Sequence, residues 1–215
     1  MTESKLSHSP QSSTIILIVS VILLGISRYL PLEHPWLFNF SPSLAIFLFC
    51  GAYFRRCSAW ITPLFAIIVS DLFLNPSYGI SFFEPFMVVT TATYLLIWII
   101  GKKIGSQRTL TAWALSAVSV ALLFHILTCS FAWAYNPAYP KSIFGFVQAI
   151  FIGEPGYAPS YLFLRNSVLG TLFFSISLRW LHSFSSNRVY LWDLISQKFK
   201  LGKNAVFEPQ KGKYL

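Results

Sequence analysis

The stretch 39-NFSPSLAIFLFCGAYFRRCSAWITPLFAIIVSDLFLN-75 holds two apolar runs separated by the basic pair Arg55 and Arg56. Apolar runs joined by a short basic turn are typical of a helical hairpin that crosses a membrane twice. Such a hairpin puts its turn on one membrane face and brings both of its outer ends together on the other. These outer ends carry four polar side chains, Asn39, Ser41, Asp71 and Asn75.

The composition of the whole chain is that of a membrane protein. Of its 215 residues, 55% are hydrophobic and only 11% are charged, and the mean hydropathy is +0.61. Soluble domains carry about 25% charged residues. The net charge of +9 is concentrated in short loops and in the C-terminal part, as membrane topology requires, and no basic face suited to nucleic acid is indicated. The sequence therefore predicts a protein whose main surroundings are the lipid bilayer.

The apolar runs predict an all-α, polytopic membrane protein with six transmembrane helices, because each crossing needs about 20 apolar residues. The second and third runs are short, so we expect their flanks to extend them or neighbouring helices to shield them. Pro63 predicts a kink or a released backbone carbonyl in the third run. The predicted spans are residues 14–30, 40–54, 59–74, 82–101, 111–134 and 161–181.

The chain divides accordingly into a polar N-terminal segment (1–13), a six-helix transmembrane domain (14–182) and a basic tail (183–215). No small-residue cleavage pattern follows the first apolar run, which predicts a retained helix and not a secretory signal. The tail interleaves apolar and basic residues from position 187 on. This pattern suits a surface helix on anionic lipid, a docking segment for a partner, or simply charge that fixes the topology.

Lysine and arginine set the predicted orientation. They gather between spans two and three, between spans four and five, and after span six, whereas the opposite loops hold acidic residues and few cations. By the positive-inside rule, we expect a multi-pass protein of the bacterial cytoplasmic (inner) membrane with both termini in the cytoplasm. The cations on the predicted inner side include Arg55, Arg56, Lys102, Lys103, Arg108, Lys211 and Lys213, and the acids on the outer side are Glu33, Glu84 and Glu154.

The predicted outer loops mix aromatic side chains with amides and a carboxylate. Aromatic belts at the membrane boundary account for part of this pattern, but aromatic walls with a few polar groups also suit a small-molecule pocket. The fifth loop contains a short apolar piece, residues 143–152 (IFGFVQAIFI). It is too short to span, so we expect a re-entrant or interfacial helix, acting either as a lid over the pocket or as a helix on the lipid surface.

Asp71 and His125 are the titratable residues near the predicted spans that need a separate explanation. Asp71 needs a partner if it is buried, and Arg165 at the start of the last span is the expected one; the alternative is that Asp71 lies in water at the interface. His125 lies well inside the fifth span. It can form a hydrogen bond between helices, gate a proton or contact a ligand.

Catalytic and metal-binding motifs are not found in the sequence. It holds no G-x-S-x-G, no H-E-x-x-H and no phosphate-binding loop, and the cysteines at 50, 57 and 129 have neither disulfide-framework nor zinc-site spacing. We therefore predict no enzymatic activity, no metal site and no cofactor. Energised transport by this chain requires a separate ATPase or a gradient.

Three segments, FNFSPSLAIFLFCGAYFRRCSAWITPLFAIIVSDLF (38–73), YPKSIFGFVQ (139–148) and FLRNSVLGTLFF (163–174), resemble an uncharacterised family of six-helix bacterial membrane proteins. Two departures from that family's pattern are Thr171, where an aspartate is usual, and the longer loop at 153–159. More distantly, the chain resembles the substrate-binding S components of energy-coupling-factor vitamin transporters. That resemblance implies an S-component-like bundle, an outward pocket, a transmembrane coupling protein and ATPases.

The sequence thus favours a membrane substrate-capture protein for a small, vitamin-like nutrient that works with an energising partner. The alternative is a non-transporting structural or assembly protein that binds a protein partner through its aromatic outer loops or its basic tail. The residues expected to bind the ligand are Trp36, Phe38, Asn39, Ser41, Asp71, Asn75, Trp133, Tyr139, Arg165 and Asn166.

Overall fold

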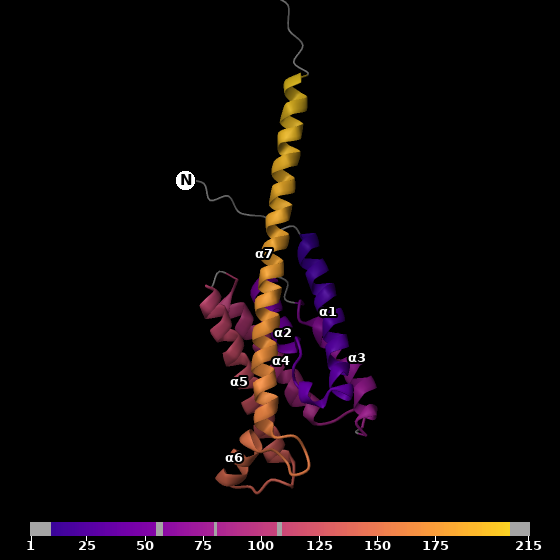
Figure 1. The fold of residues 1–215 in the computed structure, drawn as a ribbon, viewed down its shortest axis with the longest axis vertical. Helices are drawn as coiled ribbons and strands as arrows, with labels where there is room; N and C mark the ends of the chain where they lie inside the picture. The colour runs from indigo at the N-terminus through magenta and orange to yellow at the C-terminus, as the bar shows by residue number, and fades with distance from the viewer. Residues whose placement is uncertain (1–9, 55–57, 80, 107–108, 207–215) are drawn as a thin grey trace, which may run out of the picture.

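The structure, a computed structural model, describes residues 10–54, 58–79, 81–106 and 109–206, with side chains described between positions 18 and 184. The described residues are helical apart from loops, as the sequence predicts (Figure 1). The elements are α1 (Pro10–Glu33), the 3-10 helix η1 (Pro35–Leu37), α2 (Ser43–Tyr53), α3 (Ile61–Ser77), α4 (Phe86–Ile104), α5 (Leu110–Tyr135), α6 (Ile143–Phe151) and α7 (Ser160–Val206).

Three helices within the described ranges are long and apolar enough to cross a membrane. They are α4, α5 and the Ser160–Phe184 part of α7. A 25-residue helix rises about 38 Å, which exceeds the hydrocarbon core of roughly 30 Å. The membrane class predicted from composition is therefore supported by helix length as well.

The short second run forms the centre of the bundle. All residues of α2 from Ser43 to Gly51 are buried, with α4 and α7 packed against it. Its 11 residues rise only about 16 Å. The expectation that neighbouring helices shield this run is confirmed for α2, and this explains why its sequence is apolar all round.

Glycines bring α2 and α4 unusually close. A Cβ at Gly51 would lie 2.2 Å from the carbonyl oxygen of Trp98, and one at Gly101 would lie 2.4 Å from that of Leu48. Both obstacles are backbone atoms, so no side-chain rotation relieves them. The crossing therefore requires glycine at both positions, in the manner of small-residue contacts between membrane helices.

Pro63 does not kink α3. The helix begins at Ile61, so Pro63 lies in its first turn, where a backbone N–H has no partner within the helix in any case. The carbonyl group that would lose its partner to Pro63 is that of Ala59, four residues earlier, and Ala59 precedes the helix. The prediction of a kink or a released carbonyl is wrong because the helix starts two residues later than the apolar run.

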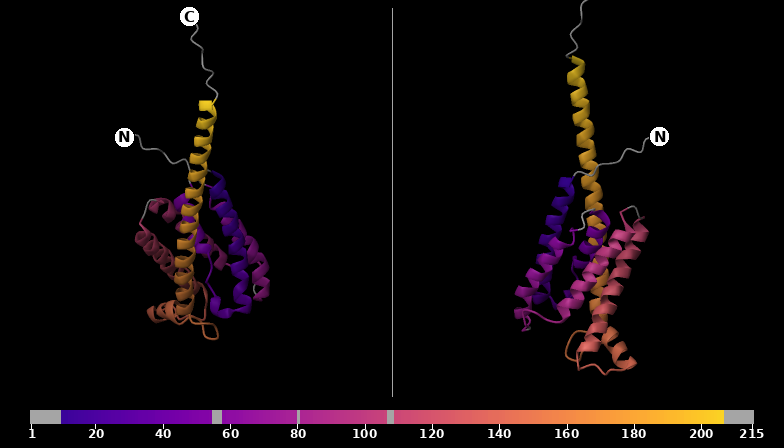
Figure 2. Two further views of the ribbon diagram at one scale, coloured as in Figure 1. Left: turned by 45° about the horizontal axis from the view of Figure 1, so that its top comes forward. Right: turned by 180° about the vertical axis from the view of Figure 1, so that it is seen from behind.

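Helix α7 is a single helix of 47 residues, about 70 Å long. Its C-terminal part extends beyond the other helices at the end of the bundle where α1 begins, and α6 lies at the opposite end (Figure 1 and Figure 2). The boundary expected between positions 182 and 183 falls inside this helix. The tail side chains from position 185 on, the basic turn at Arg55 and Arg56, and Arg108 lie outside the described residues.

Helix α6 packs against α5 and α7 through a narrow inner face. Gly145 and Ala149 are buried, and Gly145 also lies against the loop before α6, since a Cβ there would be 2.0 Å from the Pro140 carbonyl oxygen. His125 of α5 holds the far end of α6 through a 2.8 Å hydrogen bond between its Nε2 and the Ile150 carbonyl oxygen. Three roles were expected for His125, and the one seen in the structure is a hydrogen bond between two helices, α5 and α6.

Candidate functional site

Two adjoining cavities lie where α1 and α3 end and α2 and α4 begin. The first has a volume of about 170 Å³ and the second of about 240 Å³. Both are lined by Arg28, Asn39, Asn75 and Tyr94, so they form one site around the same side chains. The two outer ends of the 39–75 hairpin meet here, as its topology predicts.

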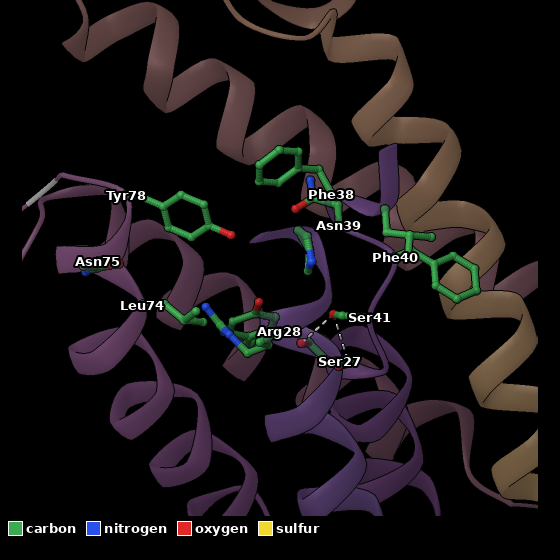
Figure 3. A pocket seen from close by; sticks show the side chains of 13 residues that line it. Ser27, Arg28, Phe38, Asn39, Phe40, Ser41, Leu74, Asn75 and Tyr78 are labelled. Carbon is green, nitrogen blue, oxygen red and sulfur yellow. Dashed lines mark hydrogen bonds between the residues drawn. The ribbon is translucent and has the colours of Figure 1, made fainter. Parts of the chain in front are cut away.

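The first cavity is lined mainly by hydroxyl and amide groups. Figure 3 shows the Tyr78 hydroxyl and the Asn39 side chain pointing into it, with Arg28 across from Phe38. The remaining lining residues are Ser27, Pro31, Leu37, Phe40, Ser41, Ser43, Leu74, Asn75 and Tyr94. Arg28 is the one charged side chain among these described residues, and its ion-pair partner Asp71 is not part of this lining.

The second cavity has carboxylates and an aromatic wall. Asp71 and Glu84 line it together with Arg28. The Tyr94 ring stacks on Phe124 with centroids 5.6 Å apart and continues into Phe47 at 5.0 Å. The other lining residues are Asn39, Ile67, Asn75, Phe86, Met87, Thr90 and Thr128. With one cation and two carboxylates among the described lining residues, this cavity is electronegative.

Arg28 of α1 and Asp71 of α3 form an ion pair through Nη2 and Oδ1. Their side chains are only 20% and 13% exposed. A buried pair of this kind gains little net stability, because taking both charges out of water offsets their attraction. The pair corrects two expectations, since the partner of Asp71 is Arg28 and not Arg165, and Asp71 is largely shielded from solvent.

The loop before α2 is shaped by Asn39 and held by α7. Asn39 has a φ of 62°, a left-handed conformation that asparagine tolerates better than most residues. Its carbonyl oxygen accepts a 3.0 Å hydrogen bond from the Ser41 N–H. A Cβ at Gly170 of α7 would lie 3.2 Å from the Ser41 nitrogen, so the loop rests directly on that helix.

Asn166, one helical turn before Gly170 in α7, holds the same loop through hydrogen bonds. Its Nδ2 donates to the carbonyl oxygens of Trp36, at 2.7 Å, and Phe38, at 2.9 Å. Its Oδ1 accepts from the guanidinium of the neighbouring Arg165 at 3.1 and 3.2 Å. Arg165, Asn166 and Trp36 are not among the residues that line either cavity. Asn166 therefore supports the site from behind.

Tyr78 and Phe38 form the aromatic edge of the first cavity. Their ring centroids are 6.1 Å apart, and Phe38 also packs edge-on against Phe163 at 5.7 Å. Burial raises the pKa of the Tyr78 phenol above its ordinary value, although the Arg28 charge opposes the shift. The side chain therefore presents a neutral hydroxyl at neutral pH.

Trp133 and Tyr139 belong to a separate cluster around α6. Trp133 donates from Nε1 to the Pro140 carbonyl oxygen at 2.9 Å and packs edge-on against Phe146, while Tyr139 is buried. No residue of α6 or of the 153–159 loop is among those lining the two cavities, nor is Thr171. As α6 contributes to neither lining, the structure gives it no role as a lid over these two cavities, and its place on the lipid surface stays a prediction.

Sequence reasoning missed Arg28 and Tyr94 as site residues and counted Glu84 only as an outer-loop acid. Arg28 had a usable signal, because a cation inside an apolar span is itself a mark of function. Tyr94 had none, since an aromatic residue in an apolar helix is ordinary. Within the described ranges, no group of three His, Cys, Asp or Glu side chains is arranged to hold a metal ion.

Comparisons with known proteins place the chain in a family. Residues 8–191 match the model of a family of unknown function, DUF6580. Comparison with curated proteins gave no match, and comparison with solved structures gave none either. The expected membership of an uncharacterised family is thus confirmed, whereas the likeness to transporter S components stays a prediction. The chain belongs to the DUF6580 family.

Proposed function

We propose that this DUF6580 member is a six-span membrane protein that captures a small polar molecule at the outer membrane face. The observation that carries the proposal is the largely shielded Arg28–Asp71 pair, which borders two adjoining cavities. Charged residues at membrane depth are costly, and where they persist they usually serve a ligand or ion path. The site joins this pair to amide, hydroxyl and aromatic groups, the mixture that small-molecule sites use.

The six spans of the proposal are α1, α2, α3, α4, α5 and α7, in the bacterial inner membrane. Lys102 and Lys103 lie in the last turn of α4, at the end from which α7 extends (Figure 2). Glu84 and Glu154 belong to the opposite end, which holds the cavities and α6. This distribution supports a cytoplasmic location for the α7 extension and an outward-facing site.

The cavity volumes favour a small solute. Ligand pockets for drug-sized molecules run from about 300 to 1,000 Å³, and the two cavities, about 170 and 240 Å³, together reach only the lower end of that range. A compact nutrient therefore fits better than a macrocyclic vitamin. Because the sequence contains no nucleotide-binding motif, uptake would require a separate energising partner, as in an S-component-like role.

A second candidate function rests on α7. Its roughly 70 Å length is more than twice the hydrocarbon thickness of about 30 Å, so part of this helix must lie outside the membrane. A projecting helix followed by a basic tail suits docking to a cytoplasmic protein. Such a partner is either the energising subunit of the first proposal or the target of a structural protein that binds no solute.

Thermal unfolding of the purified full chain in lipid nanodiscs, with a panel of small polar nutrients, tests the first function. We expect at least one solute to raise the melting temperature of the wild type but not that of the double variant Arg28→Gln/Asp71→Asn. The matched control is Lys141→Gln/Glu154→Gln, which also removes one cation and one anion but outside both cavities. Absence of any solute-dependent shift in the wild type contradicts the proposal.

Deletion of residues 187–215 separates the two functions. Solute binding should survive the deletion if the cavities are the functional site, because no described lining residue lies beyond α4 and α5 in the chain. Loss of a co-purifying protein after deletion, with no solute binding in the full chain, would favour the structural function instead.

A further inference from the structure

We infer that the captured molecule is a small zwitterion whose cationic and anionic groups are separated by a short chain. This inference rests on the proposed function and specifies the chemistry of the same site. It follows from the place of the Arg28–Asp71 pair, in which Arg28 lines both cavities and Asp71 lines only the second.

The two cavities differ in the charge that they favour. Arg28 is the charged group among the described residues of the first cavity, where it is joined by hydroxyl donors such as Ser41 and Tyr78. Guanidinium and hydroxyl groups are donors suited to a carboxylate or another oxyanion. The first cavity therefore favours the anionic end of a ligand.

The second cavity favours a cation. Asp71 and Glu84 line it, and Glu84 forms no ion pair with any described residue. Phe124 and Tyr94 add an aromatic wall beside these carboxylates, in which the Tyr94 ring already stacks on both Phe124 and Phe47. An ammonium or quaternary ammonium group would thus meet a carboxylate and an aromatic surface together.

Charge balance then selects ligands that carry both groups. An anion that takes Arg28 from Asp71 would leave a buried carboxylate without a counter-ion, and a cation that takes Asp71 would leave the guanidinium alone. An uncompensated buried charge is strongly unfavourable. A zwitterion replaces each partner of the pair charge for charge, so every buried group remains compensated. The pair therefore discriminates against singly charged solutes that displace one of its two partners.

The shared lining indicates how such a ligand would lie. Arg28, Asn39, Asn75 and Tyr94 border both cavities, so one molecule can extend from the first to the second past these side chains. The Asn39 and Asn75 amides offer both donors and acceptors along that path. The chain between the ligand's charges must be long enough to pass the ion pair, which makes charge spacing the variable to measure.

The test is calorimetric titration of the wild-type full chain in lipid nanodiscs with β-alanine, γ-aminobutyrate, δ-aminovalerate and ε-aminocaproate, together with the trimethylammonium form of each. For each length, the matched amine and the matched carboxylic acid are the controls. We expect one zwitterion length to bind roughly tenfold or more tightly than either control. The variant Glu84→Gln should weaken that zwitterion roughly tenfold, whereas Glu154→Gln, in a loop outside both cavities, should not.

The outcomes distinguish this inference from the proposed function. If an amine or an acid binds as tightly as the zwitterion of its length, the site captures solutes but the zwitterion inference is wrong. If Glu84→Gln leaves the affinity unchanged while Arg28→Gln/Asp71→Asn abolishes binding, the cationic subsite is wrong. If neither these compounds nor the broader nutrient panel bind, the proposed function itself fails.

Discussion

Arg28 of α1 and Asp71 of α3 form an ion pair that joins the two helices. The two residues are 43 positions apart in the chain. Both side chains lie within helices and are mostly shielded from solvent. Membrane helices gain little from the hydrophobic effect when they associate, because lipid is as apolar as their side chains. In the proposed six-span arrangement, we expect the pair to fix how α1 is placed against α3, even where its net stabilisation is small.

The first prediction concerns the loss of one partner of this pair. Arg28→Gln should lower the unfolding free energy by about 3–5 kcal/mol because Asp71 then carries a buried and uncompensated charge. Arg28→Gln/Asp71→Asn should be clearly more stable than the single variant, since both charges are gone. Thermal unfolding in one detergent measures both, and a double variant less stable than Arg28→Gln contradicts the prediction.

The second prediction concerns Asn166. Asn166→Ala removes two hydrogen bonds to the loop before α2, which should cost about 1–2 kcal/mol and loosen residues 36–41. Hydrogen exchange should therefore speed up at the Ser41 N–H. Ligand affinity should fall although Asn166 lines neither cavity.

Asn136→Ala is the matched control for Asn166→Ala. Asn136 is also a loop-bracing amide, with a 2.7 Å hydrogen bond to Glu154 Oε2, but it serves the loop beyond α5. Exchange at Ser41 should be unchanged in this variant. Equal acceleration in both variants would indicate general destabilisation and not a specific support of the site.

Much of the fold was predictable because apolar runs determine where membrane helices form. Each predicted span overlaps an observed helix, and the hairpin topology correctly brought Asn39, Ser41, Asp71 and Asn75 to one pair of cavities. The shielding of the second run was also foreseen, because 11 apolar residues can avoid water only when other helices cover them. Because successive spans run in opposite directions, the ends of α1 and α3 and the starts of α2 and α4 are expected at one end of the bundle, and the cavities lie there.

The partner of Asp71 could not be read in the same way. Hydropathy gives the depth of a residue along a helix but not the direction in which it faces, and α1 is apolar on most of its surface. Arg28 and Arg165 lie at the same predicted end, so only the packing of α1 on α3 decides between them. The helix start at Ile61, which removed the expected kink at Pro63, likewise depends on packing and not on hydropathy.

The third prediction concerns the crossing of α2 and α4. Gly101→Ala should destabilise the protein by about 1–3 kcal/mol because its Cβ would press on the backbone at Leu48. Gly25→Ala in α1 is the control, since nothing lies within 4 Å of a Cβ there, and it should be neutral or stabilising by up to about 1 kcal/mol. The melting temperatures of the two variants test this prediction. Similar values would contradict the close approach of α2 and α4 at Gly101.

The last prediction concerns the outer face of α6. Phe144 is 72% exposed, and Ile143 and Val147 on the same helix are exposed as well. An apolar helix face beside the ends of two helices that are long and apolar enough to cross a membrane is expected to lie in the lipid boundary. Tyr157, in the loop between α6 and α7, is 73% exposed and should face water.

Hydroxyl-radical labelling in nanodiscs should therefore modify Tyr157 far more than Phe144, although the protein alone exposes both equally. Substitution Phe144→Asp should abolish the lipid protection of α6, making Ile143 as reactive as leucine and isoleucine side chains in water. Equal labelling of Phe144 and Tyr157 in the wild type would instead mean that α6 stands clear of the membrane.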